Sequence, residues 1–393
     1  MLLLFALLVS SASALVNSFS RPSLRLTKMM SVVEKAEMEK PLEELPEEME
    51  PYLENPYYLD GDKPASAWNL GVTNFLKQGS TILGQLAEQT GLKESDPTLP
   101  PQCLNLVLSN EAVKKAERKR EENGGRVDAH PASRALYDAG CFFLDNFFEG
   151  RPIPRFWFLE TVARIPYFSY VSMLHLYESL GWWRATELRK IHGAEEYNEL
   201  HHLLICEALG GNARWSDRFI GQHAAIVYYW MLIGVYLFSP RVAYEFMELL
   251  EAHAVDTYGT FVKQNRQKLK KLPPPIAART YYGSDDLYMF DDFQVGRTPG
   301  SRRPPCDNLL DVFQNICEDE AEHVKTMQAC QVYASTGKPI ISPHLEAERL
   351  KKQPLSTEQR DQEKRDKDEK AKRALWKKWA EDVTECENPS EFF

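Results

Sequence analysis

The sequence predicts an all-α protein built on a four-helix bundle, and three observations lead to this prediction. Apolar residues recur with the helical period through most of 132–333. Two Glu-x-x-His segments, Glu199 with His202 and Glu320 with His323, lie within such runs. Single glutamates, Glu160 among them, occupy further apolar runs. Buried glutamate is rare unless it is paired or binds a metal, so these helices are expected to meet at a polar centre.

Six helical runs are expected in the core, at 132–148, 155–180, 183–209, 218–238, 240–269 and 308–333. The first has an aromatic face that includes Phe142, Phe143 and Phe147, and the second is expected to be interrupted at Pro166. The fourth is strongly apolar. The fifth begins with proline, which is tolerated at the first position of a helix.

The predicted domain organisation places flanking segments around a helical domain at 132–335. Residues 1–30 combine a short apolar run and an Ala-Ser-Ala site with a Ser/Arg-rich, acid-poor stretch, which is typical of a bipartite signal and transit presequence. Plain secretion is the alternative. Residues 31–131 are expected to form an acidic arm and a surface linker with one solvated helix, 271–306 a long loop, and 336–393 a charged tail.

Composition excludes several classes of protein. The 393 residues are 43% hydrophobic and 11% aromatic, which favours a folded chain. A net charge of −10 argues against nucleic acid as a partner, because phosphate binding needs a basic surface. The seven cysteines are scattered without a C-x-x-C pair, which favours reduced thiols over a disulfide framework or a zinc site.

The candidate metal ligands are four carboxylates and two imidazoles. On a helix, residues three apart project from one face, so each Glu-x-x-His can bind one ion. Two such helices plus one glutamate from each of two others form the ligand set of di-iron or di-manganese carboxylate bundles. Oxygen and nitrogen donors without thiolates suit iron or manganese. The expected ligands are Glu160, Glu199, His202, Glu251, Glu320 and His323.

Neighbouring positions suggest supporting roles. Ala254 and Tyr258 share the helical face of Glu251, so the Tyr258 phenol is expected near the metal and Ala254 leaves space beside it. A core tyrosine hydrogen-bonded to a carboxylate is the alternative for Tyr258. Asn198 and Asp319 each precede a ligand glutamate and are candidates to orient the ligand histidines.

The apolar runs at 132–148 and 218–238 carry no proposed ligand. If the ligand helices already close a bundle, these two must bury their faces in a dimer or in one leaflet of a membrane. The longer one has too few uninterrupted apolar positions for a span of about 20 residues, which favours attachment to one leaflet.

The Leu-Glu-Thr around Glu160, the Asn-Glu-x-x-His from Asn198, the Leu-Glu-Ala-His-Ala around Glu251 and the Asp-Glu-x-x-His from Asp319 resemble, in this order, the motifs of the alternative oxidase family. The resemblance covers about 132–333. His253, where mitochondrial members usually carry a carboxylate, and the long 271–306 loop make it most similar to the plastid branch, the plastid terminal oxidases.

This resemblance implies a ferritin-like di-iron bundle with two additional apolar helices on a membrane surface. It implies a quinol oxidase with two iron ions, which oxidises plastoquinol and reduces O2 to water without proton pumping. It also implies a homodimer attached to the stromal face of the thylakoid membrane. Tyr258 would be the redox tyrosine, and the quinol pocket would be lined by Arg155, Leu159, Ala254 and Thr257.

Three alternatives remain open from the sequence. The protein could be another carboxylate-bridged di-iron enzyme, such as a lipid hydroxylase or desaturase, which would need an external reductant. It could be a mitochondrial-type ubiquinol oxidase. It could also be a structural helical protein on a membrane surface, in which the buried glutamates and histidines only pair with one another.

Overall fold

The computed structural model describes residues 65–92, 106–283, 304–338, 340 and part of 362–374, and the regular structure within these ranges is helical. The predicted presequence at 1–30 and the acidic arm up to residue 64 lie outside the described residues. Residues 345–393 form a separate unit, in which the described positions are helical.

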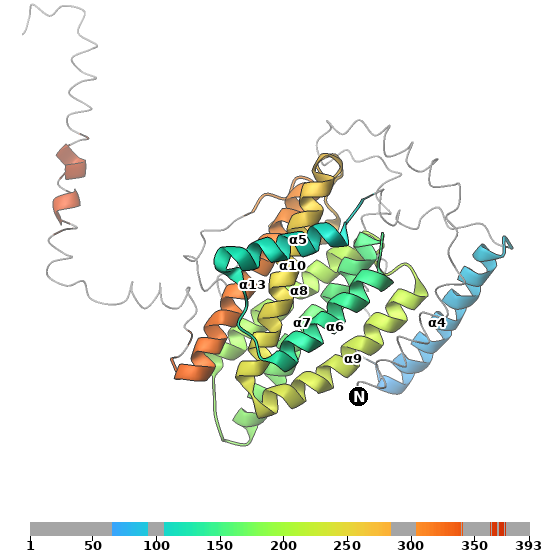
Figure 1. The fold of residues 1–393 in the computed structure, drawn as a ribbon, viewed down its shortest axis with the longest axis horizontal. Coiled ribbons are helices and arrows are strands. Elements are labelled where there is room, and N and C mark those ends of the chain that lie inside the picture. Colours follow the sequence, from blue (N-terminus) through green and yellow to red (C-terminus); the bar gives the residue numbers. More distant parts are fainter. Residues whose placement is uncertain are drawn as a thin grey trace, which may run out of the picture. The chain divides into compact units, whose positions relative to one another are not determined.

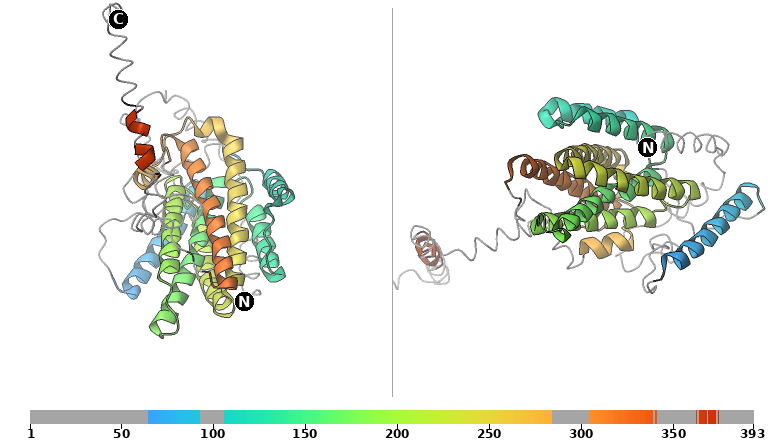
Figure 2. Two further views of the ribbon diagram at one scale, coloured as in Figure 1. Left: turned by 90° about the vertical axis from the view of Figure 1, so that its left-hand side faces the viewer. Right: turned by 90° about the horizontal axis from the view of Figure 1, so that it is seen from below.

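The helices α7, α8, α10 and α13 form the bundle, and further helices lie against it (Figure 1). Within the bundle, α10 packs along α13 and α7 packs along α8 (Figure 2). Outside it, α9 lies against α7 and α10, and α6 lies against α10. The all-α prediction is therefore confirmed. The bounds are α6 Pro131–Phe147, α7 Pro152–Ser179, α8 Thr186–Ala208, α9 Trp215–Phe238, α10 Pro240–Leu269 and α13 Leu309–Thr336.

Local sequence fixes several helix ends. Ser239 caps α10 by accepting a hydrogen bond from the Val242 amide, and Pro240 follows as the first helical residue. Asn308 caps α13 in the same way through the Asp311 amide. At its other end α13 stops at Gly337, whose φ of 71° is a left-handed conformation that glycine adopts without strain.

The expected interruption at Pro166 is wrong, because α7 continues through this residue. Proline has no N–H, so the helix loses one backbone hydrogen bond there. Pro166 is buried, and Tyr167 beside it is part of the core. Because the turn is packed between neighbouring helices, tertiary contacts outweigh the local preference of proline to end a helix.

The segment that precedes α6 differs from the expected surface linker. Helix α5, Asn110–Arg120, lies against α10, and a π-helical turn at Glu121–Gly125 follows it. Leu106, Val113 and Val127 are buried, and Arg120 forms an ion pair of 2.8 Å with Asp256 of α10. The charged run 111–122 is therefore the outer face of a packed helix rather than a linker.

The predicted long loop also contains structure. Helix α11, Ile276–Gly283, lies against α8 and buries Ala278, Tyr281 and Tyr282. The Leu309 amide at the start of α13 donates to the Leu272 carbonyl at 2.8 Å, which ties the two ends of this connection together. Residues 284–303 lie outside the described chain.

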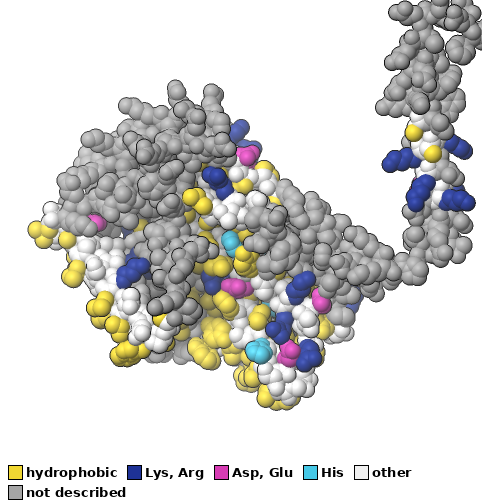
Figure 3. Space-filling view, turned by 180° about the vertical axis from the view of Figure 1, so that it is seen from behind, with side chains coloured by type: hydrophobic (Ala, Val, Ile, Leu, Met, Phe, Trp, Pro, Cys, Tyr) yellow, Lys and Arg dark blue, Asp and Glu magenta, His cyan; other side chains and the backbone are white. Residues whose placement is uncertain are grey.

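Large apolar side chains are exposed on several helices, among them α9, α6 and α4. On α9 they include Trp230, which is 66% exposed, and Phe238, which is 88% exposed, and on α6 Phe142 is 72% exposed. The N-terminal helix α4, Ala67–Gln89, exposes Trp68, Phe75 and Leu83 among others, and hydrophobic side chains gather along its outer edge (Figure 3). Within the described chain, α9 alone is long and apolar enough to cross a membrane by length and composition.

Candidate metal centre

The structure brings the six predicted ligand residues together in the middle of the bundle. Glu160 comes from α7, Glu199 and His202 from α8, Glu251 from α10, and Glu320 and His323 from α13. They form two overlapping groups, in each of which the potential ligand atoms lie within 4.8 Å of one another. Glu199 and Glu320 belong to both groups.

The histidine nitrogens point into the carboxylates. His202 Nδ1 lies 3.1 Å from Glu320, 3.6 Å from Glu199 and 3.7 Å from Glu160. His323 Nδ1 lies 3.0 Å from Glu199, and 3.7 Å from both Glu251 and Glu320. Each imidazole therefore faces three carboxylates from different helices.

These donor atoms are buried and lie close together, but many of them form no hydrogen bond with one another. Glu160, Glu199, Glu320 and His202 are all at most 2% exposed. Glu160 Oε2, both carboxylate oxygens of Glu199 and of Glu320, and His202 Nδ1 make no hydrogen bond of good geometry. Buried polar atoms without a partner are strongly unfavourable, and converging carboxylate and imidazole donors are what a hard metal ion requires. The residues present fit a pair of bound metal ions.

Burial and mutual repulsion govern the protonation of the cluster. Burial raises the pKa of Glu160 well above its ordinary range, and Glu199 adds to this. Burial likewise raises the pKa of Glu251, with a contribution from Glu320. Although burial disfavours the imidazolium, the surrounding carboxylates raise the pKa of His202 and His323. Protons thus supply the positive charge that four clustered carboxylates need, and metal ions would replace them.

A polar layer behind the cluster orients His202. The Asp319 carboxylate lies 3.1 Å from His202 Nε2 and accepts hydrogen bonds from Asn198 at 3.1 Å and from Tyr282 at 2.9 Å. With Nε2–H donating to Asp319, His202 Nδ1 faces the carboxylates, and its lone pair would be free for a metal ion once the proton there is displaced. Asn198 also donates to the Tyr281 hydroxyl at 2.8 Å. Both tyrosines come from α11, which the sequence did not predict as a helix.

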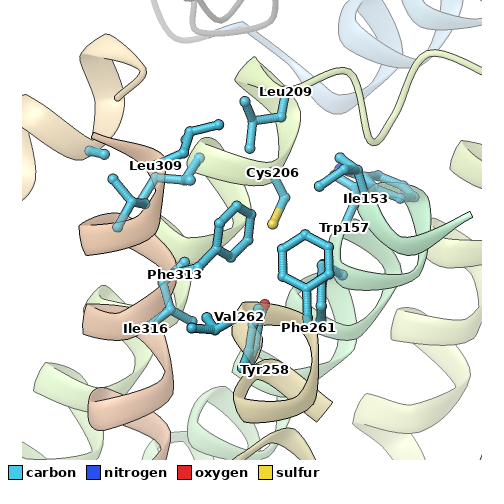
Figure 4. Close-up of a cluster of buried hydrophobic side chains, with 14 of the residues drawn as sticks. Ile153, Trp157, Cys206, Leu209, Tyr258, Phe261, Val262, Leu309, Phe313 and Ile316 are labelled. Atoms are coloured by element: carbon cyan, nitrogen blue, oxygen red, sulfur yellow. The ribbon is translucent and has the colours of Figure 1, made fainter. Parts of the chain in front are cut away.

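Tyr258 lies on the other side of the cluster. Its hydroxyl donates a hydrogen bond to Glu160, and its ring stacks on Phe156 with centroids 4.3 Å apart. Figure 4 shows Tyr258 in an apolar layer with Phe261 and Val262 of α10 and with Phe313 and Ile316 of α13. Burial raises the pKa of Tyr258 well above its ordinary range, so the phenol is held neutral against a carboxylate of the cluster.

Tyr167 is a contact that the sequence analysis missed. Its hydroxyl donates a 2.6 Å hydrogen bond to Glu251, and its ring lies edge-on to that of His323. Tyr167 follows Glu160 by seven residues, so both lie on the same face of α7. That spacing could have identified it, had the helix not been expected to break at Pro166.

The residues predicted to line a pocket beside the cluster fall into two pairs. Leu159 on α7 and Ala254 on α10 are partly exposed and pack against the apolar core. Thr257 is buried, and its hydroxyl donates to the His253 carbonyl. Arg155 is 1% exposed.

The Arg155 guanidinium belongs to a buried network rather than to the surface. It donates to Asn110 at 2.8 Å, contacts the Asp145 carboxylate at 3.1 Å, and lies 3.4 Å from His253 Nε2. Tyr137 of α6 lies 3.1 Å from the other ring nitrogen of His253. Burial lowers the pKa of His253 to about 3, and Arg155 acts in the same direction, so this imidazole is neutral.

Comparison with known proteins agrees with this site. Residues 111–331 match the family model described as Alternative oxidase. The chain is 52% identical over 209 residues to the chloroplastic/chromoplastic ubiquinol oxidase 4 of Arabidopsis thaliana, covering 53% of this chain and 58% of the relative. It is 28% identical over 185 residues to the mitochondrial ubiquinol oxidase 1b of Oryza sativa subsp. japonica, covering 46% of this chain and 48% of the relative. The chain thus spans about half the length of the curated relatives it matches, and the matched region contains the whole cluster. This protein belongs to the alternative oxidase family.

Proposed function

We propose that this protein is a di-iron quinol oxidase that oxidises plastoquinol and reduces O2 to water at a plastid membrane surface without pumping protons. The observation that carries the proposal is the pair of ligand groups sharing Glu199 and Glu320. The Arabidopsis relative is a chloroplastic/chromoplastic ubiquinol oxidase, which supports both the reaction class and the plastid location. The higher identity to this relative than to the rice mitochondrial protein favours the plastid branch.

The proposed ligands are Glu160, Glu199, His202, Glu251, Glu320 and His323, and the bound iron pair would supply the redox chemistry between quinol and O2. The chain's own residues hold and orient this centre. Asp319 fixes the His202 ring, with Asn198 and Tyr282 holding Asp319 in turn. Tyr258 is placed to give a proton or an electron at Glu160, because its hydroxyl donates to that carboxylate within an apolar layer that excludes water.

The quinol would approach between α7 and α10. Leu159 on α7 and Ala254 on α10 supply partly exposed apolar surface, and Thr257 and Arg155 are buried on the same two helices. Because Asn110, Asp145 and His253 hold the Arg155 guanidinium, we propose that Arg155 fixes the shape of the pocket wall through this network. His253 is neutral, so Arg155 carries the positive charge of this hydrogen-bonded network and His253 adds none.

The first prediction concerns Glu320, which belongs to both ligand groups. Replacing it by alanine is expected to remove bound iron and abolish plastoquinol-dependent O2 uptake, because neither ion keeps its full ligand set. Glu318→Ala, two residues away and exposed on the same helix, is the matched control and is expected to retain both. The measurement is iron content per chain and O2 uptake by purified, iron-loaded protein with a plastoquinol analogue and cyanide present.

Other outcomes of this experiment distinguish the alternatives. Uptake that requires an external reductant and yields an oxygenated lipid would indicate a hydroxylase or desaturase. Faster turnover of a ubiquinol analogue than of the plastoquinol analogue would favour the mitochondrial type of activity. A folded wild-type protein that binds no iron would indicate a structural helical protein without enzymatic activity.

The second prediction concerns pH. In the metal-free protein the raised pKa values of Glu160, Glu251, His202 and His323 mean that the folded state holds protons which the unfolded state releases. Folding stability should therefore fall as pH rises between about 5 and 8. Metal ions displace these protons, so metal affinity should rise over the same range.

Anaerobic calorimetry with Fe²⁺, and with Mn²⁺ as a redox-stable probe, checks this prediction. We expect net proton release on binding and a metal-induced increase in Tm that is larger at pH 7.5 than at pH 5.5. Metal binding without proton release would contradict the protonation of the cluster derived above. The Glu318→Ala variant is expected to behave as the wild type in both measurements.

We also propose that α6 and α9 attach the protein to one leaflet of the membrane. Their outer faces expose Phe142, Trp230 and Phe238, whereas the inner face of α9, including Leu232 and Tyr236, is buried against the bundle. Because one face of α9 packs on the bundle and the other is apolar and exposed, we propose that it lies on the membrane surface. A homodimer formed through the same apolar faces is the competing arrangement.

Vesicle flotation tests the attachment. Trp230→Glu and Phe238→Glu are each expected to weaken binding to galactolipid vesicles by about tenfold or more, because burial of one aromatic side chain contributes roughly 1.5–3 kcal/mol. Val332→Glu, at an exposed apolar position on α13, is the control and is expected to have little effect. Unchanged vesicle binding together with dissociation of a dimer would favour the dimer and contradict the membrane face.

A further inference from the structure

A second buried polar cluster lies outside the ligand set. His192 and Glu195 come from α8, Tyr244 from α10 and Tyr236 from α9, and all four are at most 2% exposed. His192 Nδ1 lies 2.9 Å from Glu195, His192 Nε2 lies 3.1 Å from the Tyr244 hydroxyl, and the Tyr244 and Tyr236 hydroxyls are 2.9 Å apart. None of these residues has a role in the function proposed above.

The hydrogen bonds of this cluster can all point the same way, with each donor facing the next acceptor from Tyr236 through Tyr244 and His192 to Glu195. When the Glu195 carboxylate accepts the proton on His192 Nδ1, the imidazole presents an unprotonated Nε2 to Tyr244. The Tyr244 phenol then donates to Nε2 and accepts a hydrogen bond from Tyr236. A phenol paired with a neutral imidazole that a carboxylate supports can lose its proton to the imidazole at the moment it loses an electron.

Aromatic side chains connect this phenol to the metal centre. The Tyr170 ring lies 5.0 Å from the Tyr244 ring, and Tyr167 lies 6.3 Å from Tyr170, measured between centroids. Tyr167 donates a 2.6 Å hydrogen bond to the ligand candidate Glu251. These separations are those of rings in contact, so every step from Tyr244 to the cluster is short.

The chain of rings also continues towards solvent. Tyr177 and Tyr333 are partly buried and pack against the core that contains Tyr170, Tyr236 and Tyr244. Tyr177 lies 6.3 Å from the Trp182 ring, and Trp182 is 70% exposed. The path thus reaches the surface beyond the end of α7.

A purely structural role leaves part of this cluster unexplained. Glu195 is fully buried, and its Oε1 makes no hydrogen bond, which costs free energy that an apolar side chain would not. Five tyrosines, Tyr167, Tyr170, Tyr177, Tyr236 and Tyr244, gather in one small core.

We propose that Tyr244 is a redox-active tyrosine that donates one electron to the oxidised metal centre through Tyr170 and Tyr167 when quinol is absent, and that gives its phenolic proton to His192. The inference rests on the proposed function, because reduction of O2 without enough quinol supplies the oxidant. One electron reduces the metal centre, and one proton moves from the Tyr244 oxygen to His192 Nε2. The products are a neutral tyrosyl radical and an imidazolium paired with Glu195.

The relay would protect the ligands and Tyr258 from oxidation. One electron from a reductant in solution such as ascorbate then reduces the Tyr244 radical through Trp182, Tyr177 and Tyr236, and the reductant becomes a radical. The proton returns from His192 Nε2 to the Tyr244 oxygen, which restores the phenol. Oxidising equivalents that would otherwise attack the metal ligands are thereby transferred to the protein surface, where the soluble reductant consumes them.

The test uses full-length, iron-loaded, reduced protein mixed with O2 in the absence of quinol and then rapidly frozen for electron paramagnetic resonance. We expect a tyrosyl radical that narrows when the protein contains ring-deuterated tyrosine and that decays on addition of ascorbate. Tyr244→Phe and His192→Gln are each expected to lose most of this signal. The control is Tyr228→Phe, a partly buried tyrosine of α9 that packs on Phe246 outside the relay.

Quinol-dependent O2 uptake and iron content separate the two proposals. With excess plastoquinol analogue, Tyr244→Phe is expected to keep wild-type uptake and iron content, because turnover does not use the relay. After quinol-free exposure to O2, mass spectrometry should find oxidised Trp182 in the wild type and, in Tyr244→Phe, oxidation moved to the metal ligands.

A full radical signal in Tyr244→Phe, or the absence of any tyrosyl radical from a wild-type protein with full quinol-dependent uptake, would overturn the relay and leave the proposed function intact. A wild-type protein without uptake would overturn both.

Discussion

Everything in this fold depends on the burial of four carboxylates and two imidazoles in one small volume between four helices. Like charges at such distances cannot all remain ionised without a counter-charge. The structure meets this constraint by taking ligand candidates from four different helices, α7, α8, α10 and α13, so that no single helix carries the repulsion. The apolar layer around Tyr258 on one side and Tyr167 on the other then closes the cluster to water.

The cluster has different surroundings at Glu160 and at Glu251, and we assign a different role to each side. On the Glu160 side, Tyr258 contacts a carboxylate beside Leu159 and Ala254, where a reductant could approach. On the Glu251 side, Tyr167 leads away from the cluster into a second core of tyrosines around His192 and Glu195. In our proposals, Tyr258 takes part in quinol oxidation. Tyr167 instead conducts oxidising equivalents away from the cluster when no quinol is bound.

The sequence predicted the residues that meet at the centre better than those that surround it. Glu199 with His202 and Glu320 with His323 were visible because helical spacing and the cost of burying charge are local properties. Tyr281 and Tyr282 were missed because their contacts with Asn198 and Asp319 depend on how α11 docks. The start of the packed region was placed too late, since Val113 is a single apolar anchor in a charged run and its helix is held by partners over 100 residues away, such as Asp256. Pro166 was misjudged because packing outweighs a local preference.

The central claim is that the cluster holds two iron ions together rather than one or none. Iron K-edge X-ray absorption on the iron-loaded protein, combined with metal analysis, tests it most directly. The account predicts two irons per chain, oxygen and nitrogen neighbours only, and an iron–iron separation of about 3.5–4 Å. One iron per chain with no iron neighbour, or sulfur ligation, would contradict it.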